Sequence, residues 1–179
     1  MRWLAPLVAA GVFILDRLSK AYFLTHPTTE IQLIPNVLWL QYHLNERMAL
    51  SLPLFPILYF TLVAVVILVL IAKAVQLQQD KRWSQLMIVG CVLAGAISNL
   101  LDRLLYGGVV DFISVNLGSV FNLADIAIVA SVAAWLIVLS YADRKKAVQT
   151  HSWRFYLRAV RATGERQWLH QSLSAMFYL

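Results

Sequence analysis

The chain has 179 residues, of which 60% are hydrophobic and 13% are charged, whereas soluble globular domains are about 45–50% apolar and about 25% charged. This composition excludes an ordinary soluble domain and is typical of a membrane protein. The single cysteine, Cys91, excludes an intramolecular disulfide and a multi-cysteine metal site. The net charge of +6 is expected to come from cytoplasmic Lys and Arg, not from a nucleic-acid partner.

Four segments are apolar enough to cross a bilayer as helices, which takes about 20 residues each. Predicted transmembrane helices lie at about 3–24, 54–75, 86–106 and 121–141. The first of them carries charges in its second half. Asp16 and Lys20 lie one turn apart on the same face, so an ion pair between them is the simplest interpretation. The sequence therefore predicts an all-α membrane protein with four transmembrane helices.

Residues 25–53 form the first of two connections expected on the outer side of the membrane. This segment combines β-branched and aromatic residues with turn formers, and Ile31–Leu33 and Val37–Tyr42 are predicted as short strands. A small extracytoplasmic β element on the membrane surface is therefore expected here. Residues 107–120, the second connection, are expected to form an outer loop.

The basic residues set the predicted orientation. The connection between the second and third helices contains Lys81 and Arg82, and the segment after the fourth helix opens with the sequence DRKK. Because Lys and Arg concentrate on the cytoplasmic side, both termini are predicted to be cytoplasmic. Residues 1–142 are expected to form one four-span domain. Residues 143–179 are expected to form a basic cytoplasmic tail, either as an amphipathic helix on the membrane surface or as a poorly ordered segment.

Polar residues recur at helical spacing near the ends of the third and fourth predicted helices. In the predicted orientation these polar residues lie near the outer membrane surface. The polar residues of the first helix and the aspartate of the second outer connection are expected at the same depth. The predicted cluster consists of Asp16, Lys20, Asn99, Asp102, Arg103, Asp111, Asn122 and Asp125. Charges inside a bilayer cost about 2.5–3.5 kcal/mol each, so their convergence at one depth indicates a site.

Several cluster members also have a purely structural interpretation. Asp102 and Arg103 are adjacent in sequence, and each would reach a neighbouring element as a clamp. Asn122 is suited to cap a helix or to bond across helices. Taken alone, Asp111 would be a loop residue, and Asp125 a helix-start residue favoured by the helix dipole.

Asp111 and Asp125 together suit aspartic-type hydrolysis. Two carboxylates close together cannot both ionise easily, so one proton is shared. The ionised group can take a proton from the water that attacks an amide, and the protonated group can donate to the carbonyl oxygen or the leaving nitrogen. Which aspartate holds the proton is left open. No HExxH or CxxC pattern occurs, and no metal or other cofactor is expected.

Two stretches of the chain, GAISNLLDRLLYGGVVDFI and the following VFNLADIAI, resemble the paired signature of a known family. This is the lipoprotein signal peptidase family, also called signal peptidase II, whose members are bacterial membrane aspartyl proteases. The sequence DRLSK at residues 16–20 resembles the family's first motif, and the resemblance extends to about Tyr141. It implies that Asp111 and Asp125 are the catalytic pair. The implied substrate-binding or supporting residues are Asp16, Lys20, Asn45, Asn99, Asp102, Arg103 and Asn122.

The resemblance also implies a function and a location. The substrate would be a prolipoprotein whose lipobox cysteine carries a diacylglyceryl group, cut just before that cysteine. The acyl chains would hold the scissile bond at the depth of the carboxylates. The implied location is the bacterial cytoplasmic (inner) membrane, with substrate and membrane phospholipids as partners, no nucleic acid, and a monomeric state.

One motif leaves alternatives open. The family pattern Asn-x-Gly-x-Ala-Phe corresponds to the stretch starting at Asn45, where Arg47 replaces the glycine and Leu50 replaces the phenylalanine. A second hypothesis is therefore a catalytically weakened paralogue that binds lipids or lipoproteins. A third is a small transporter or proton-coupled carrier that uses Asp16, Asp102 and Asp125, which is less favoured because the charges cluster at one face and no inverted repeat occurs.

Overall fold

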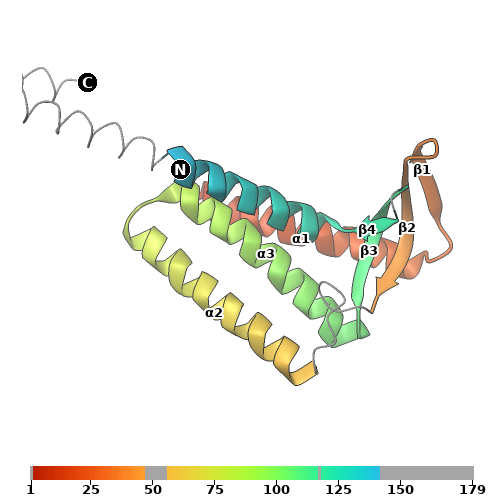
Figure 1. The fold of residues 1–179 in the computed structure, drawn as a ribbon, viewed down its shortest axis with the longest axis horizontal. Coiled ribbons are helices and arrows are strands. Elements are labelled where there is room, and N and C mark those ends of the chain that lie inside the picture. The colour runs from red at the N-terminus through yellow and green to blue at the C-terminus, as the bar shows by residue number, and fades with distance from the viewer. Residues whose placement is uncertain (1, 47–55, 117, 142–179) are drawn as a thin grey trace, which may run out of the picture. The chain divides into compact units, whose positions relative to one another are not determined.

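The structure, a computed structural model, describes residues 2–46, 56–116 and 118–141 (Figure 1). The chain divides into two compact units, Met1–Trp135 and Leu136–Leu179. The first unit contains all the elements discussed below except the last turns of the helix Leu123–Tyr141. The predicted tail at 143–179 lies outside the described residues, and so do Arg47 and Leu50.

The described residues contain α1 (Leu4–Thr25), α2 (Pro56–Gln79), α3 (Trp83–Tyr106) and the helix Leu123–Tyr141. Three segments within the described residues are long and apolar enough to cross a membrane, namely Ile57–Gln79, Trp83–Tyr106 and Leu123–Tyr141. α1 has a comparable length but carries three charged side chains, Asp16, Arg17 and Lys20. The mostly helical architecture with apolar spans agrees with the predicted fold class.

The connection between α2 and α3 is shorter than predicted. α2 ends at Gln79 and not at about residue 75, and α3 begins at Trp83 and not at about residue 86. The glutamines at the end of α2 are good helix formers, so their polarity does not end the helix. The backbone N–H of Arg82 donates to the Leu77 carbonyl at 2.9 Å, with Lys81 in the left-handed conformation at φ 55°. The basic connection is therefore a tight turn.

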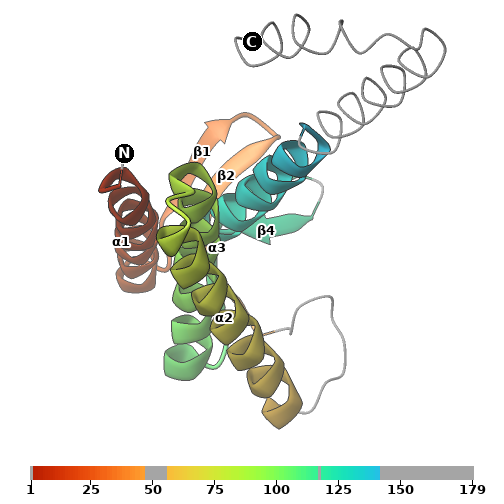
Figure 2. The same cartoon turned by 90° about the vertical axis from the view of Figure 1, so that its left-hand side faces the viewer.

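α3 lies between α1 and α2 and packs against both (Figure 2). Small residues permit these close contacts. A Cβ added at Gly95 would lie 2.8 Å from the carbonyl oxygen of Ala124, so the helix Leu123–Tyr141 begins directly against α3. A Cβ added at Gly90 would lie 3.2 Å from that of Ala9 in α1. Such packing through small residues is typical of helices within membranes.

A four-stranded antiparallel sheet adjoins the helices. Its strands are β1 (Glu30–Ile34), β2 (Leu38–Asn45), β3 (Val109–Val115) and β4 (Ser119–Phe121), in the order β1-β2-β3-β4. The predicted small β element is therefore present. The predicted outer loop at 107–120 is wrong, because its sequence VVDFISV forms β3 and pairs with β2. Four of these seven residues are β-branched and one is aromatic, which favours a strand over a loop.

The passage from α3 into β3 uses two adjacent glycines. Gly107 ends α3 in the left-handed conformation at φ 74°. A Cβ added at Gly108 would lie 3.0 Å from the carbonyl oxygen of Asn45, so β3 starts in close contact with β2. The Phe112 ring on β3 stacks on Phe23 near the end of α1, with centroids 5.1 Å apart. These contacts fix β3 against both the helices and β2.

Candidate active site

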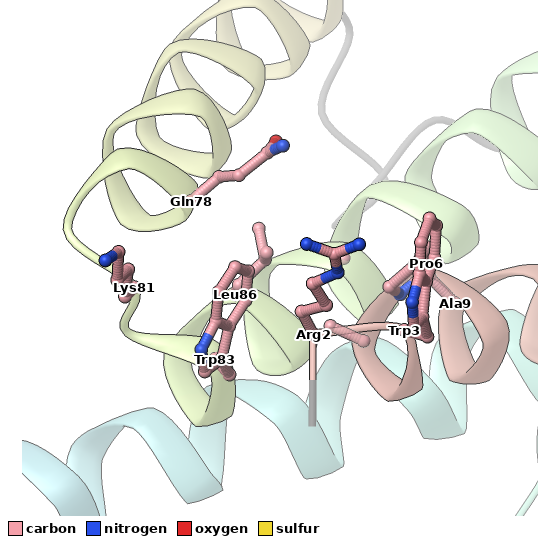
Figure 3. Close-up of a pocket in the computed structure, with 10 residues that line it drawn as sticks. Arg2, Trp3, Pro6, Ala9, Gln78, Lys81, Trp83 and Leu86 are labelled. Carbon is pink, nitrogen blue, oxygen red and sulfur yellow. The ribbon is translucent and has the colours of Figure 1, made fainter.

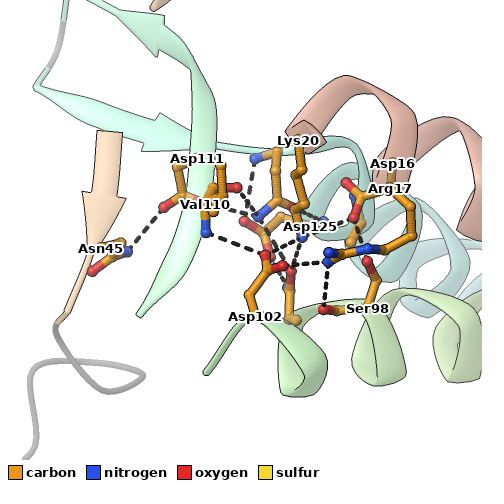
Figure 4. A network of polar contacts seen from close by, with 12 residues as sticks. Asp16, Arg17, Lys20, Asn45, Ser98, Asp102, Val110, Asp111 and Asp125 are labelled. Atoms are coloured by element: carbon orange, nitrogen blue, oxygen red, sulfur yellow. Dashed lines mark hydrogen bonds and ion pairs between the residues drawn. The ribbon is translucent and has the colours of Figure 1, made fainter. Parts of the chain in front are cut away.

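Asp111 and Asp125, called the aspartate pair below, lie where the sheet meets the start of the helix Leu123–Tyr141 (Figure 4). Asp111 is on β3 with 1% of its surface exposed, and Asp125 is partly buried in the first turn of the helix. Asn122 joins the two. Its Nδ2 donates to Asp111 Oδ1 at 2.7 Å, and its Oδ1 accepts the backbone N–H of Asp125 at 2.9 Å. One asparagine therefore holds both aspartates in register.

Asn122 and Asp125 also cap the helix reciprocally. Asp125 Oδ2 accepts the backbone N–H of Asn122 at 3.4 Å, while Asn122 Oδ1 accepts the backbone N–H of Asp125. This is the arrangement of a capping box, in which two otherwise unpaired backbone donors are satisfied. The helix start also favours a negative charge at Asp125 through the helix dipole. The predicted capping role of Asn122 is present, and so is the alternative of a bond across helices, since its Nδ2 donates to Asn99 Oδ1 on α3 at 3.2 Å.

Asn99 of α3 connects the aspartate pair to a buried ammonium. Its Nδ2 donates to Asp125 Oδ1 at 2.8 Å. Its Oδ1 accepts from Lys20 Nζ at 2.7 Å and from Asn122 Nδ2 at 3.2 Å. The amide therefore orients the Asp125 carboxylate on one side and contacts a positive charge on the other.

Lys20 is fully buried and has an acceptor for each of its three N–H donors. Its Nζ lies 2.8 Å from Asp16 Oδ2, 2.8 Å from Asp102 Oδ2 and 2.7 Å from Asn99 Oδ1. Arg17 forms a second ion pair with Asp102. The two cations and two carboxylates sum to zero formal charge, which offsets the cost of burying each ion. The predicted ion pair of Asp16 with Lys20 is present within this larger network.

Two carboxylates of this network also hold the backbone on which the aspartate pair lies. Asp102 Oδ2 accepts the backbone N–H of Val110 at 3.2 Å, and Asp16 Oδ1 accepts that of Ala124 at 2.8 Å. Asp16 Oδ2 additionally accepts from Ser98 Oγ at 2.6 Å. Val110 and Ala124 directly precede the two members of the aspartate pair in sequence. The predicted clamp role of Asp102 thus takes the form of contacts with α1 and β3.

The surroundings of the Asp111 carboxyl raise its pKa and so favour its protonated form. Burial, together with a smaller effect of the nearby Asp125 charge, raises its pKa to about 6. The hydrogen bond from Asn45 Nδ2 to Asp111 Oδ2, at 3.0 Å, favours the ionised form and limits the rise. Asn122 and the Lys20 charge act in the same direction as Asn45. Near neutral pH the balance still leaves a fraction of Asp111 protonated.

The structure brings most of the predicted site residues into this one network. Arg103 instead faces α2, with its Cζ 5.1 Å from the centroid of the Tyr59 ring. Arg17 and Ser98 are members of the network that the sequence analysis missed. Ser98 lies one turn before Asp102, which would have suggested it. Arg17 points into the same network as its neighbour in sequence, and spacing alone gives no sign of this.

Comparison with known proteins identifies the family. The profile of the family described as Signal peptidase (SPase) II matches residues 8–141. A lipoprotein signal peptidase of Syntrophomonas wolfei is 37% identical over 143 residues, which cover 75% of this chain and 91% of that protein. A lipoprotein signal peptidase of Moorella thermoacetica is 34% identical over 137 residues, covering 74% and 91% of the two chains.

Solved structures agree on the fold. A bacterial membrane enzyme determined by the in meso method at 2.3 Å resolution superposes with a TM-score of 0.67 at 24% identity, over 80% of this chain and 91% of that chain. The family match spans all of the helical and sheet region except the first turn of α1, and it does not favour the alternative of a non-enzymatic binding protein. The chain therefore belongs to the signal peptidase II family, which confirms the resemblance predicted from its motifs and the prediction that it is a protease.

Proposed function

We propose that this chain is a membrane aspartyl endopeptidase that removes signal peptides from prolipoproteins, cutting before a cysteine that carries a diacylglyceryl group. The observation that carries the proposal is the placement of the aspartate pair, joined through Asn122 at the junction of β3 and the helix Leu123–Tyr141. The relatives named as lipoprotein signal peptidases support the substrate class. The substrate's acyl chains lie in the bilayer and deliver the scissile bond to the carboxylates.

The two carboxyl groups have different roles in the proposed reaction. Asp125 takes a proton from a water molecule while the water oxygen attacks the scissile carbonyl carbon. At the same time Asp111 donates its proton to the carbonyl oxygen. The resulting tetrahedral diol collapses when the carbon–nitrogen bond breaks. The leaving nitrogen takes the proton from Asp125, and the diol returns a proton to Asp111. The raised pKa of Asp111 supports its role as the initial acid.

Three asparagine side chains position the aspartate pair in this proposal, namely Asn45, Asn99 and Asn122. An asparagine amide is uncharged, so they add no charge to the site. Their amides donate to carboxylate oxygens at distances of 2.7 to 3.0 Å. Asp16, Lys20 and Asp102 position the backbone, and Arg103 is a supporting residue at the α2 side. Fixed polar groups of this kind reduce the reorganisation that the reaction requires.

α1 is the fourth membrane span in this proposal, in addition to the three strongly apolar helices. Asp16 and Lys20 are fully buried against α3, whereas Leu7, Ile14 and Leu15 on the outside of α1 are apolar and exposed. The helix therefore presents hydrocarbon to lipid and charge to protein. With Lys81 and Arg82 on the cytoplasmic side, both termini are cytoplasmic, and the sheet and the aspartate pair lie at the outer surface. The protein acts as a monomer surrounded by phospholipids.

A cleavage assay tests the function. The purified full chain is incubated with a diacylated prolipoprotein and with the same precursor lacking the lipid, and products are resolved on gels and by mass spectrometry. We expect cleavage before the lipidated cysteine only, and none with Asp111→Asn or Asp125→Asn. Asp80→Asn, in the exposed α2–α3 turn, is the matched control and should cleave normally. Normal processing by either pair variant would refute the assignment, and binding without cleavage by the wild type would favour a lipoprotein-binding protein.

A further inference from the structure

A cavity of about 550 Å³ lies at the other end of α3 from the aspartate pair, between the start of α1, the end of α2 and the start of α3 (Figure 3). Trp83, which lines it, and Asp102, which belongs to the site, are 19 residues apart on one helix. At 1.5 Å per residue this is a separation of about 28 Å. The hydrocarbon core of a bilayer is about 30 Å thick, so the cavity and the aspartate pair lie at opposite membrane surfaces.

The cavity combines cations, indole rings and an apolar wall. Arg2 and Trp3 line one side, with the guanidinium carbon 4.8 Å from the centroid of the Trp3 ring. Lys81 and Trp83 line the other side. Within the described parts of the chain, no carboxylate lies at ion-pair distance from Arg2 or Lys81. The remaining walls are Ala5, Pro6, Ala9, Gln78, Leu86 and Gly90. The cavity therefore presents positive charge beside an apolar surface.

The backbone at Lys81 gives a second, independent indication. Lys81 occupies the left-handed position that ends α2, at φ 55°, where helices prefer glycine. A left-handed conformation costs free energy in a residue with a side chain, because the Cβ comes close to the backbone. A glycine would avoid that cost, and the lysine places an ammonium at the wall of the cavity. Strain of this kind is typically found where the side chain serves a site.

We propose that this cavity binds an anionic phospholipid, with Arg2 and Lys81 contacting its phosphate group. Trp3 and Trp83 lie at the level of the headgroup, as tryptophans do at membrane interfaces. Ala5, Ala9 and Leu86 receive the first carbons of an acyl chain. In the topology proposed above the cavity opens at the cytoplasmic leaflet, which carries acidic lipids that basic pockets between membrane helices recognise. The bound lipid ties the start of α1 to the α2–α3 turn.

Lipid titrations of the purified full chain in a zwitterionic detergent test this. Phosphatidylglycerol, phosphatidylcholine with the same acyl chains, and inorganic phosphate are each added, and binding is followed by native mass spectrometry and by the unfolding temperature. We expect the wild type to bind phosphatidylglycerol at least tenfold more tightly than phosphatidylcholine. Arg2→Gln and Lys81→Gly should each lose most of this preference. Cleavage by both variants without added lipid should equal that of the wild type.

Two features of the design separate a lost site from a damaged fold or a general charge effect. Lys81→Gly relieves the backbone strain, so its unfolding temperature without lipid should match or exceed that of the wild type. Lys73→Gln removes one positive charge from α2 outside the cavity, where Lys73 bonds Gln76, and should keep the preference. An unchanged preference in Lys81→Gly and Arg2→Gln would overturn the proposal. So would an equal loss in Lys73→Gln, or displacement of the lipid by inorganic phosphate.

Discussion

Asp16 and Asp102 make equivalent contacts on two sides of Lys20. Each carboxylate lies 2.8 Å from the Lys20 ammonium. Each also accepts one backbone N–H, Asp16 from Ala124 at 2.8 Å and Asp102 from Val110 at 3.2 Å. A single buried ammonium therefore sets the distance between the two backbone segments that carry the aspartate pair.

Lys20→Met tests the role of this ammonium in stability. Methionine keeps an unbranched apolar side chain but leaves the buried Asp16 carboxylate without its cation, while Asp102 keeps Arg17. Breaking a buried ion pair in this way typically costs about 3–5 kcal/mol. We expect a loss of this size in the free energy of unfolding, measured by detergent denaturation in mixed micelles. Adding Asp16→Asn to Lys20→Met should recover part of the loss, because it removes the carboxylate that has lost its cation. A single variant that unfolds like the wild type would contradict the role of Lys20.

Gly95→Ala tests the contact between α3 and the helix Leu123–Tyr141. The added methyl group would lie 2.8 Å from the Ala124 carbonyl oxygen and 2.9 Å from a side-chain carbon of Ile128, so the helix must move. Overpacking of this kind costs about 1–3 kcal/mol, and it displaces the first turn that carries Asp125. We expect lower stability and a lower kcat. Gly11→Ala is the matched control, because nothing lies within 4 Å of its added Cβ and alanine is the better helix former, so it should lower neither quantity.

Substitutions at Asn122 separate helix capping from alignment of the aspartate pair. Asn122→Ala removes the cap and the bond to Asp111, and should cost about 1 kcal/mol in stability as well as activity. Asn122→Ser keeps a capping oxygen but has no amide to reach Asp111. We therefore expect the serine variant to regain the stability and not the activity, with kcat lowered by up to about 10²-fold, as for small displacements of reacting groups. Full activity in Asn122→Ser would show that the bond to Asp111 is dispensable.

The pKa of Asp111 predicts the pH dependence of cleavage. In the proposed reaction Asp111 must begin protonated, and burial raises its pKa to about 6. We expect kcat/KM to fall about tenfold per pH unit above that value, since kcat/KM reports groups of the free enzyme. The hydrogen bond from Asn45 favours the ionised form, so Asn45→Ala should move the midpoint to higher pH. A midpoint that stays in place or moves to lower pH would contradict the assignment of the acid.

The same shift has a consequence for stability, with the sign fixed by linkage. The ordinary pKa of the carboxyl is 3.8, and the folded protein raises it to about 6. The folded state therefore binds this proton more tightly than the unfolded state. The stability that the proton contributes is complete below a pH of about 4 and is lost as the pH rises through about 6. Asp111→Asn should remove this part of the pH dependence of unfolding.

The helices and the polar cluster could be predicted because both depend on spacing along the chain. Apolar runs of sufficient length define the spans, and Asn99 with Asp102 or Asn122 with Asp125 share a helix face by their spacing alone. Spacing along the chain does not reveal β3, because a short connection between two spans is ordinarily a loop. Pairing with β2 across more than sixty residues decides its structure, as the bond between Asn45 and Asp111 over 66 residues illustrates.

The contacts that place the aspartate pair could not be predicted, because they involve backbone groups. The N–H groups of Val110 and Ala124 have no sequence signature, and their acceptors lie on other elements. The contact of Arg17 with Asp102 could not be predicted for a related reason. Arg17 follows Asp16 directly on a helix, so the two side chains point in different directions, and only the packing of α1 on α3 shows that Arg17 also meets the network through Asp102.

The long sequence separation within the charged network bears on how the nascent chain enters the membrane. Arg17 meets a partner 85 residues later, and Asp16 meets partners 82 and 108 residues later. At about 5–20 residues per second, a ribosome needs roughly 4–20 s to synthesise the residues between Arg17 or Asp16 and these partners. During that interval α1 has only the local bridge between Asp16 and Lys20 to neutralise its charges. The membrane-insertion machinery must therefore keep the charged face of this first helix away from lipid until α3 has been synthesised and packs against it.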